Sequence, residues 1–238
     1  MSDTLLEKDI HALILASKDT TPERVAAFFK TGAGQYSAHD QFLGIRIPTL
    51  RQISRSCHHF SLDQVTYFLT QPFNELRYFA LILLLHRLKC EVSMLDVVYQ
   101  FYRQYLEYIN NWNLVDLSAA PIVGAYTLSQ GNGDVVLLSA SSNLWRRRIA
   151  IVSTAYSITR GDFSLTLELA ERYFHDSETL IHQATGWMLR EVGKKDTPML
   201  SDFLDVFAHQ MPRTMLRYAI EHYPQSIRTH YLSKKKSL

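Results

Sequence analysis

The spacing of apolar residues is the feature that most constrains the fold of this chain. Apolar side chains recur three and four residues apart along most of the sequence, as they do on the buried face of a helix. No segment alternates apolar and polar residues for long enough to form a half-buried strand. Glycine and proline, which interrupt helices, number only 9 and 7 among 238 residues. The sequence therefore predicts an all-α protein.

Residues that favour helix starts place the expected boundaries. Thr21 is a suitable N-cap, because Pro22 follows it at the first helical position. Pro48 can open a helix that runs to about Cys57, and apolar residues from Leu5 to Leu15 predict an earlier one. Further helices are expected at 62–70, 73–88, 94–108, 112–129, 134–140, 144–159, 163–174, 178–192, 198–210, 213–222 and 225–232.

Caps and breakers refine this expectation. We expect N-caps at Asn143, Ser177 and Asp196, and helix exits at Gly161 and Gly193. Pro121 lies inside the apolar stretch after residue 116, where its missing N–H should bend or interrupt the helix.

Small residues recur within the apolar helices at spacings of roughly 31 to 39 residues, the size of a stacked helix pair. They are Ala80, Ala119, Ala150, Ala184 and Ala219. Arg77 and Arg147 each stand three positions before one of them. The period predicts one α-solenoid domain of HEAT-like repeats over residues 1–238, with a concave face lined by the second helices. Residues 1–40 would add N-terminal helices, and residues 233–238 a basic tail.

Composition sets limits on partners and compartment. The formal net charge is only +2, so an anionic partner must be bound by local clusters of charge. Cys57 and Cys90 lie apart in apolar surroundings and are expected to be buried free thiols in a reducing compartment. The N-terminus lacks the basic start of a signal peptide, and the apolar run at 81–85 is too short for a membrane span. We expect a soluble cytoplasmic protein.

Several kinds of site are missing from the sequence. The histidines and cysteines show no zinc-binding spacing, so no metal is expected. Gly131 and Gly133 predict a turn, because the segment is too short for a phosphate-binding loop, and no nucleophile elbow is present. We expect no cofactor.

Trp112 and Asp116 are four residues apart and therefore share one face of their expected helix. An aromatic plane beside a carboxylate can recognise a cation. The other tryptophans, Trp145 and Trp187, lie in segments that also carry arginines. Each residue has a plainer interpretation, since tryptophan often lies in a core, Asp116 could cap a helix, and the arginine run could be solvated.

Together these residues favour chemistry on a nucleic acid. Asp116 would stabilise a sugar cation that develops as a glycosidic bond breaks, because a poorly solvated carboxylate lowers the energy of that charge. Phosphates could be held by a set of basic residues. This set comprises Arg148, Arg190, Arg213, Arg217, Lys194 and Lys195.

Four segments, at 42–48 (FLGIRIP), 108–116 (YINNWNLVD), 143–150 (NLWRRRIA) and 186–191 (GWMLRE), closely resemble the AlkD-like family of DNA alkylation repair enzymes. The resemblance runs in order from about residue 40 to residue 232. It implies a HEAT-like repeat fold and a monofunctional glycosylase that removes positively charged alkylpurines, such as 3-methyladenine and 7-methylguanine, from duplex DNA. It also implies that the base is not drawn into a pocket, unlike in base-flipping enzymes.

The resemblance gives individual residues their expected roles. Asp116 corresponds to the catalytic carboxylate, and Trp112 and Trp187 would contact the lesion nucleotide. Arg148 would hold the DNA backbone nearby. We further expect contacts to the DNA backbone from Arg190, Arg147, Lys194 and Arg213, and we expect the protein to be a monomer. This chain departs from the family pattern at Arg46, a long cation where a neutral side chain is expected, and in a longer segment at 36–41.

Two other functions stay open. Relatives that lack the carboxylate are expected to bind distorted or branched DNA without catalysis, whereas a HEAT adaptor would bind protein. Asp116 favours the enzyme over the binding module. The adaptor predicts no salt-dependent DNA affinity.

Overall fold

The computed structural model describes residues 6–57 and 59–234, and it has an all-α helical-repeat fold. Within those residues the only strand-like pairing is an isolated bridge between Gln41 and Phe73. The chain forms two compact units, Met1–Ser118 and Ala119–Leu238, which are described separately. The expectation of a single repeat domain therefore stays a prediction.

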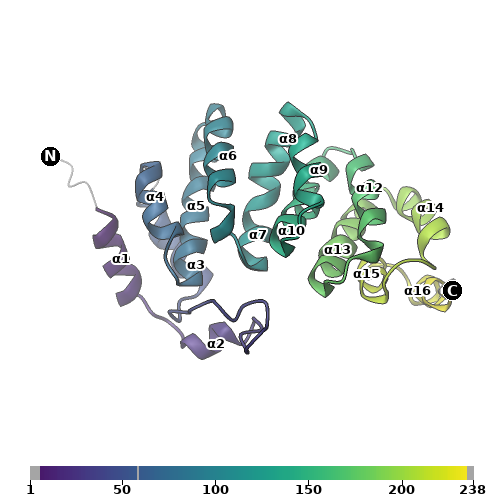
Figure 1. Cartoon of the computed structure of the whole chain (residues 1–238), viewed down its shortest axis with the longest axis horizontal. Helices are drawn as coiled ribbons and strands as arrows, with labels where there is room; N and C mark the ends of the chain where they lie inside the picture. Colours follow the sequence, from purple (N-terminus) through teal and green to yellow (C-terminus); the bar gives the residue numbers. More distant parts are fainter. Residues whose placement is uncertain (1–5, 58, 235–238) are drawn as a thin grey trace. The chain divides into compact units, whose positions relative to one another are not determined.

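The first unit is built around one long buried helix, α5 (Figure 1). Every residue of α5 from Asn74 to Leu84 is buried, and α3, α4 and α7 contact it. The elements are α1 (Glu7–Ala16), α2 (Pro22–Ala26), α3 (Ile47–Ser54), α4 (Leu62–Leu69), α5 (Asn74–Cys90), η1 (Val92–Met94), α6 (Leu95–Gln104), η2 (Leu106–Tyr108) and α7 (Trp112–Ser118). A helix that is buried all round needs apolar residues on every side, as the run Ala80–Leu84 supplies.

The second unit has its centre in α13, which contacts α10, α12, α14 and α15. Its elements are η3 (Ala119–Gly124), α8 (Ala125–Gln130), α9 (Gly133–Ser139), α10 (Leu144–Ser153), α11 (Ala155–Ile158), α12 (Ser164–Arg172), η4 (Tyr173–His175), α13 (Thr179–Lys195), α14 (Thr197–Phe207), α15 (Arg213–Ala219) and α16 (Gln225–Ser233). Gly186 lets α13 approach α15 closely, because a Cβ there would lie 2.4 Å from the carbonyl oxygen of Met215.

The repeat of small residues corresponds to packed positions. All five alanines of the repeat are at most 2% exposed, in α5, η3, α10, α13 and α15. Small side chains at these positions let neighbouring helices approach one another, which explains their recurrence.

Most of the expected helix ends are confirmed. The side chains of Thr21, Asn143 and Asp196 accept hydrogen bonds from backbone N–H groups in the first turn of the helix that follows. Gly161 follows α11 with a positive φ of 83°. Pro121 lies in a π-helical turn, η3, because its missing N–H cannot complete the regular hydrogen-bond ladder.

Three expectations are wrong. Ser177 is not an N-cap, since α13 begins at Thr179 and the Asp176 carboxylate accepts the N–H of Glu178 at 2.8 Å. Gly193 does not end α13 but lies inside it, where the absence of a side chain makes room for Leu200. Cys90 is exposed at the end of α5, whereas Cys57 is buried as expected, and both thiols are free.

The two ends are only partly described. Residues 1–5 and 235–238, including Leu5 and most of the basic tail, lie outside the described residues. Within the description, Lys234 forms an ion pair with Asp205 at 3.1 Å. No helix among the described residues is both long enough and apolar enough to cross a membrane.

Candidate functional site

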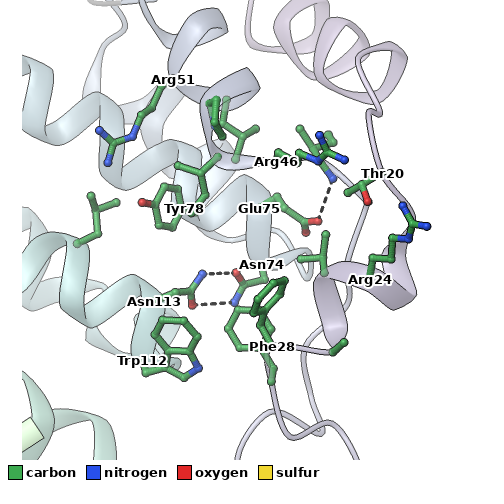
Figure 2. Close-up of a pocket in the computed structure, with 18 of the residues that line it drawn as sticks. Thr20, Arg24, Phe28, Arg46, Arg51, Asn74, Glu75, Tyr78, Trp112 and Asn113 are labelled. Carbon is green, nitrogen blue, oxygen red and sulfur yellow. Dashed lines mark hydrogen bonds between the residues drawn. The ribbon is translucent and has the colours of Figure 1, made fainter.

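The first unit contains a largely apolar pocket of about 1020 Å³ (Figure 2). The segment around α2, the loop at 42–48 and helices α3, α5 and α7 form its walls. It is lined by Thr20, Arg24, Val25, Ala27, Phe28, Phe29, Ile45, Arg46, Ile47, Pro48, Leu50, Arg51, Asn74, Glu75, Tyr78, Trp112, Asn113, Asp116 and Leu117. An apolar cavity with a few polar groups is typical of ligand sites.

Trp112 and Asp116 both line this pocket from α7. Their predicted placement on one helical face is therefore confirmed. The Trp112 ring stacks on Phe29 with 5.2 Å between ring centroids, and Phe29 stacks in turn on Phe42 at 5.0 Å. This stack supports one face of the indole and fixes its orientation.

The start of α7 is held by a buried polar network. Asn111, fully buried, accepts the backbone N–H of Trp112 at 2.7 Å through its side-chain oxygen, and its amide donates to Ser37 at 2.7 Å and to Asp40. The Asp40 side chain is fully buried and also pairs with Arg77. Through Ser37 and Asp40, the segment at 36–41 thus positions the helix that carries Trp112 and Asp116.

A second brace joins α7 to α5. The side-chain amides of Asn113 and Asn74 exchange two hydrogen bonds, of 2.7 and 3.3 Å, at the pocket wall (Figure 2). Asn74 is 2% exposed and Asn113 is half-buried, so this pair is partly shielded from water. Buried amides with satisfied partners fix a single helix register.

The loop at 42–48 is anchored by a carboxylate from α5. Glu75, 4% exposed, accepts backbone N–H groups of Leu43 and Gly44 at 3.0 Å and of Ile45 at 3.5 Å. Gly44 has a φ of 86°, and a Cβ there would lie 2.6 Å from the Thr20 carbonyl oxygen. The glycine of the FLGIRIP segment therefore serves both the turn and the close approach of two backbones.

Asp19 fixes the other end of the loop. Its carboxylate accepts the N–H of Arg46 at 2.8 Å and the hydroxyl of Thr49 at 2.6 Å, so it caps α3 from a distant part of the chain. Although burial by itself acts to raise the pKa of Asp19, these hydrogen bonds and the Arg46 charge outweigh it, and the pKa is lowered.

The pocket combines carboxylate and guanidinium groups. Three exposed arginines, Arg24, Arg46 and Arg51, line it together with Asp116. Burial raises the pKa of the Tyr102 hydroxyl; its hydrogen bond with Ser118 opposes the rise, and the nearby charge of Asp116 adds to it. Asp116 is half-buried, so its charge acts in a partly desolvated setting.

The sequence pattern missed several lining residues. Phe28 is 76% exposed at the pocket, and Tyr78 and Asn74 lie four residues apart on the α5 face that borders it. This i, i+4 spacing is a detectable signal, but within a continuously apolar helix nothing marks which face borders a cavity.

The arginine run at 146–148 lies in the second unit, on α10. Arg147 pairs with Asp176 at 2.7 Å and donates to the carbonyl oxygens of Ser141 and Ser142, both at 2.9 Å. Arg148 is 5% exposed and donates to the Leu180 carbonyl oxygen at 2.7 Å. Both guanidinium groups thus hold neighbouring backbone or side-chain oxygens within the unit.

Four other candidate residues of the second unit have protein partners too, whereas Arg217 and Lys195 are exposed and have no side-chain partner among the described residues. The indole N–H of Trp187 donates to Glu191 at 3.1 Å, and Lys194 reaches the same carboxylate at 2.7 Å. Arg190 pairs with Glu221, and Arg213 donates to the Leu232 carbonyl oxygen at 2.6 Å. Trp187, Arg190 and Lys194 belong to α13, and Arg213 belongs to α15.

Trp145 differs from the other tryptophans. It is 8% exposed and belongs to the core, so the plainer interpretation holds for this residue. Among the described residues, no group of three or more histidine, cysteine, aspartate or glutamate side chains could hold a metal ion.

Comparison with known proteins identifies relatives. Residues 10–223 match the family described as DNA alkylation repair enzyme. A predicted DNA alkylation repair enzyme from Enterococcus faecalis has a similar structure, with 17% sequence identity and a TM-score of 0.68, covering 87% of this chain and 98% of that one. At this identity the likeness shows the fold alone. No curated protein matches the sequence.

Proposed function

Because the chain belongs to the family of DNA alkylation repair enzymes, we propose that it is a monofunctional DNA glycosylase for positively charged alkylpurines such as 3-methyladenine and 7-methylguanine. The observation that carries this proposal is the placement of Asp116 beside Trp112 in one apolar pocket with an arginine-bearing wall. That combination suits a substrate that is cationic at the base and anionic along the backbone.

The proposed chemistry begins with a substrate that already carries positive charge. As the N-glycosidic bond breaks, its electron pair leaves with the purine, which becomes neutral, and positive charge develops at C1′ of the sugar. The half-buried Asp116 stabilises this charge more strongly than a fully hydrated carboxylate would. Water then adds to C1′ and releases its proton.

Trp112 supplies the neighbouring aromatic plane. Its ring is held against Phe29, so it meets the lesion in a prepared orientation, and attraction between a cation and its π-face favours the alkylated base. Trp187 of the second unit is proposed as a further lesion contact. Arg190, Lys194 and Arg213 are proposed as contacts to the DNA backbone, whereas Arg147 and Arg148, which hold acceptors within the second unit, are assigned a structural role.

The central test compares the parent protein with Asp116→Asn on duplex DNA that contains 7-methylguanine. We expect the parent to release the base and leave abasic sites, and the variant to release it about 10²- to 10³-fold more slowly, as for loss of one electrostatic group. Asp63→Asn, an exposed change on α4 away from the pocket, is the matched control.

The possible outcomes distinguish the glycosylase activity, a non-catalytic DNA-binding function and the role of Asp116. Absence of base release by the parent would overturn the glycosylase, and tight duplex binding without release would favour a non-catalytic module. Equal rates for the parent and Asp116→Asn would remove only the role assigned to that carboxylate.

A further inference from the structure

The hydroxyl of Tyr78 is a polar group that the proposed chemistry does not use. Tyr78 lies on α5 and is 6% exposed, yet its side chain lines the pocket. No described residue forms a hydrogen bond with this hydroxyl. At the pocket this hydroxyl is free to bond to a ligand, and a ligand atom that accepts its hydrogen gains a hydrogen bond there.

Arg51 supplies a second donor on the same pocket. It projects from α3, which contacts α5, and its exposed guanidinium has no partner among the described residues. In Figure 2 the Tyr78 hydroxyl points away from Glu75 and toward the side of the pocket where Arg51 lies. Tyr78 and Arg51 thus supply this side of the pocket with one neutral and one cationic donor that have no acceptor among the described residues.

These two donors fit a phosphate group. A guanidinium matches the oxygens of a phosphate in two parallel hydrogen bonds, and a phenol hydroxyl adds a third, charge-assisted bond. The surrounding side chains, including Leu50 and Leu117, are apolar and can contact a sugar.

We propose that Tyr78 and Arg51 form a phosphate subsite that holds a backbone phosphate beside the nucleotide on which Asp116 acts. This inference rests on the proposed function for the identity of that nucleotide. The subsite itself is tested by binding, which needs no catalysis.

The experiment measures the affinity of the intact chain for a labelled duplex with a tetrahydrofuran abasic analogue, by fluorescence anisotropy over a series of salt concentrations. Tyr78→Phe should weaken binding about tenfold and leave the salt dependence unchanged, because it removes a neutral donor. Arg51→Gln should weaken binding and lower the slope of log affinity against log salt by about one, because one phosphate contact is lost.

Matched controls keep the residue type and change the location. Tyr67→Phe removes a hydroxyl that bonds to His11 at 2.8 Å, and Lys89→Gln removes an exposed charge at the end of α5. Neither residue lines the pocket, so neither change should alter affinity by more than about twofold. Tyr78→Phe should keep the parent melting temperature, because its hydroxyl holds no described protein group.

A second series places single neutral methylphosphonates in the duplex. At one position the substitution should weaken binding by the parent but have little further effect on Arg51→Gln, since both remove the same contact. Inorganic phosphate at millimolar concentration should not displace the duplex, whereas displacement would indicate a site for free phosphate instead.

Parent-like affinity of Tyr78→Phe, or a parent that fails to bind the duplex at low salt, would overturn the subsite. If the parent releases the base and both Tyr78→Phe and Arg51→Gln bind the duplex like the parent, the subsite is overturned and the proposed glycosylase activity is unaffected. Weakened binding by both variants without base release would support the subsite and overturn the glycosylase.

Discussion

The pocket arginines of the first unit differ from the arginine pair at 147–148 of the second. In the first unit, Arg24 and Arg51 extend from the pocket wall without a partner among the described residues. In the second, Arg147 and Arg148 are turned to acceptors within the unit, although their segment is the most basic of the motifs. A run of arginines in a sequence therefore does not by itself locate a phosphate-binding surface.

The repeat explains part of this difference. Arg77 and Arg147 both stand three residues before a repeat alanine, and each forms an ion pair with an aspartate, Asp40 or Asp176. Arginine at this repeat position has the same structural task in both units. The partnerless arginines of the first unit lie elsewhere, on α2 and α3.

The largest expected effect concerns these two ion pairs. Asp40→Ala should lower the free energy of unfolding by about 3–5 kcal/mol, because it leaves the buried Arg77 charge uncompensated and removes an acceptor from Asn111. Asp176→Ala should lower the free energy of unfolding by less, since the Arg147 side chain is 13% exposed and keeps its hydrogen bonds to backbone carbonyl oxygens. Urea unfolding of both variants measures the difference, and equal losses would contradict the comparison.

The next effect separates binding arginines from structural ones. Arg24→Gln should weaken duplex binding about fivefold and reduce its salt dependence, without loss of stability. Arg147→Gln should lower the melting temperature and leave the salt slope near that of the parent. The opposite pattern would mean that the ion pair with Asp176 opens to bind DNA.

The smallest effect is a pH dependence in the first unit. Burial lowers the pKa of His11 below its ordinary value, so the unfolded chain takes up the proton first as the pH falls. The contribution of neutral His11 to stability is therefore complete above the unfolded pKa of about 6.5 and decreases as the pH falls below it. Chemical unfolding at pH 7.5 and pH 5.5 measures this effect in the parent and in His11→Gln. Between these pH values the free energy of unfolding should fall slightly more in the parent than in the variant. An equal fall in both proteins would contradict the prediction.

Local sequence signals predicted the helical elements well. Thr21, Asn143 and Asp196 cap helices as expected because a cap depends only on the few residues around it. Gly193 misled the prediction, since its role is set by Leu200 on the next helix and not by its neighbours in sequence.

The candidate site was only partly predictable. The spacing of Trp112 and Asp116 placed both on one helical face, and the structure puts both at the same pocket. Tyr78 could not be found in this way, because it lies in a helix that is apolar all round and whose sequence does not reveal which side meets a cavity.

The sequence by itself determined that this chain is helical, where most helices begin, and that an aromatic residue and a carboxylate share one face of α7. These features depend on residues within a few positions of one another. Only the tertiary structure decided that Asp40 braces α7 and that Arg77 and Arg147 pair with aspartates. It also decided that the side chains of Arg51 and Tyr78 meet the pocket without a partner among the described residues. The physical reason is that a partner for a charge or a hydroxyl is chosen by proximity in space, which links residues far apart in the chain.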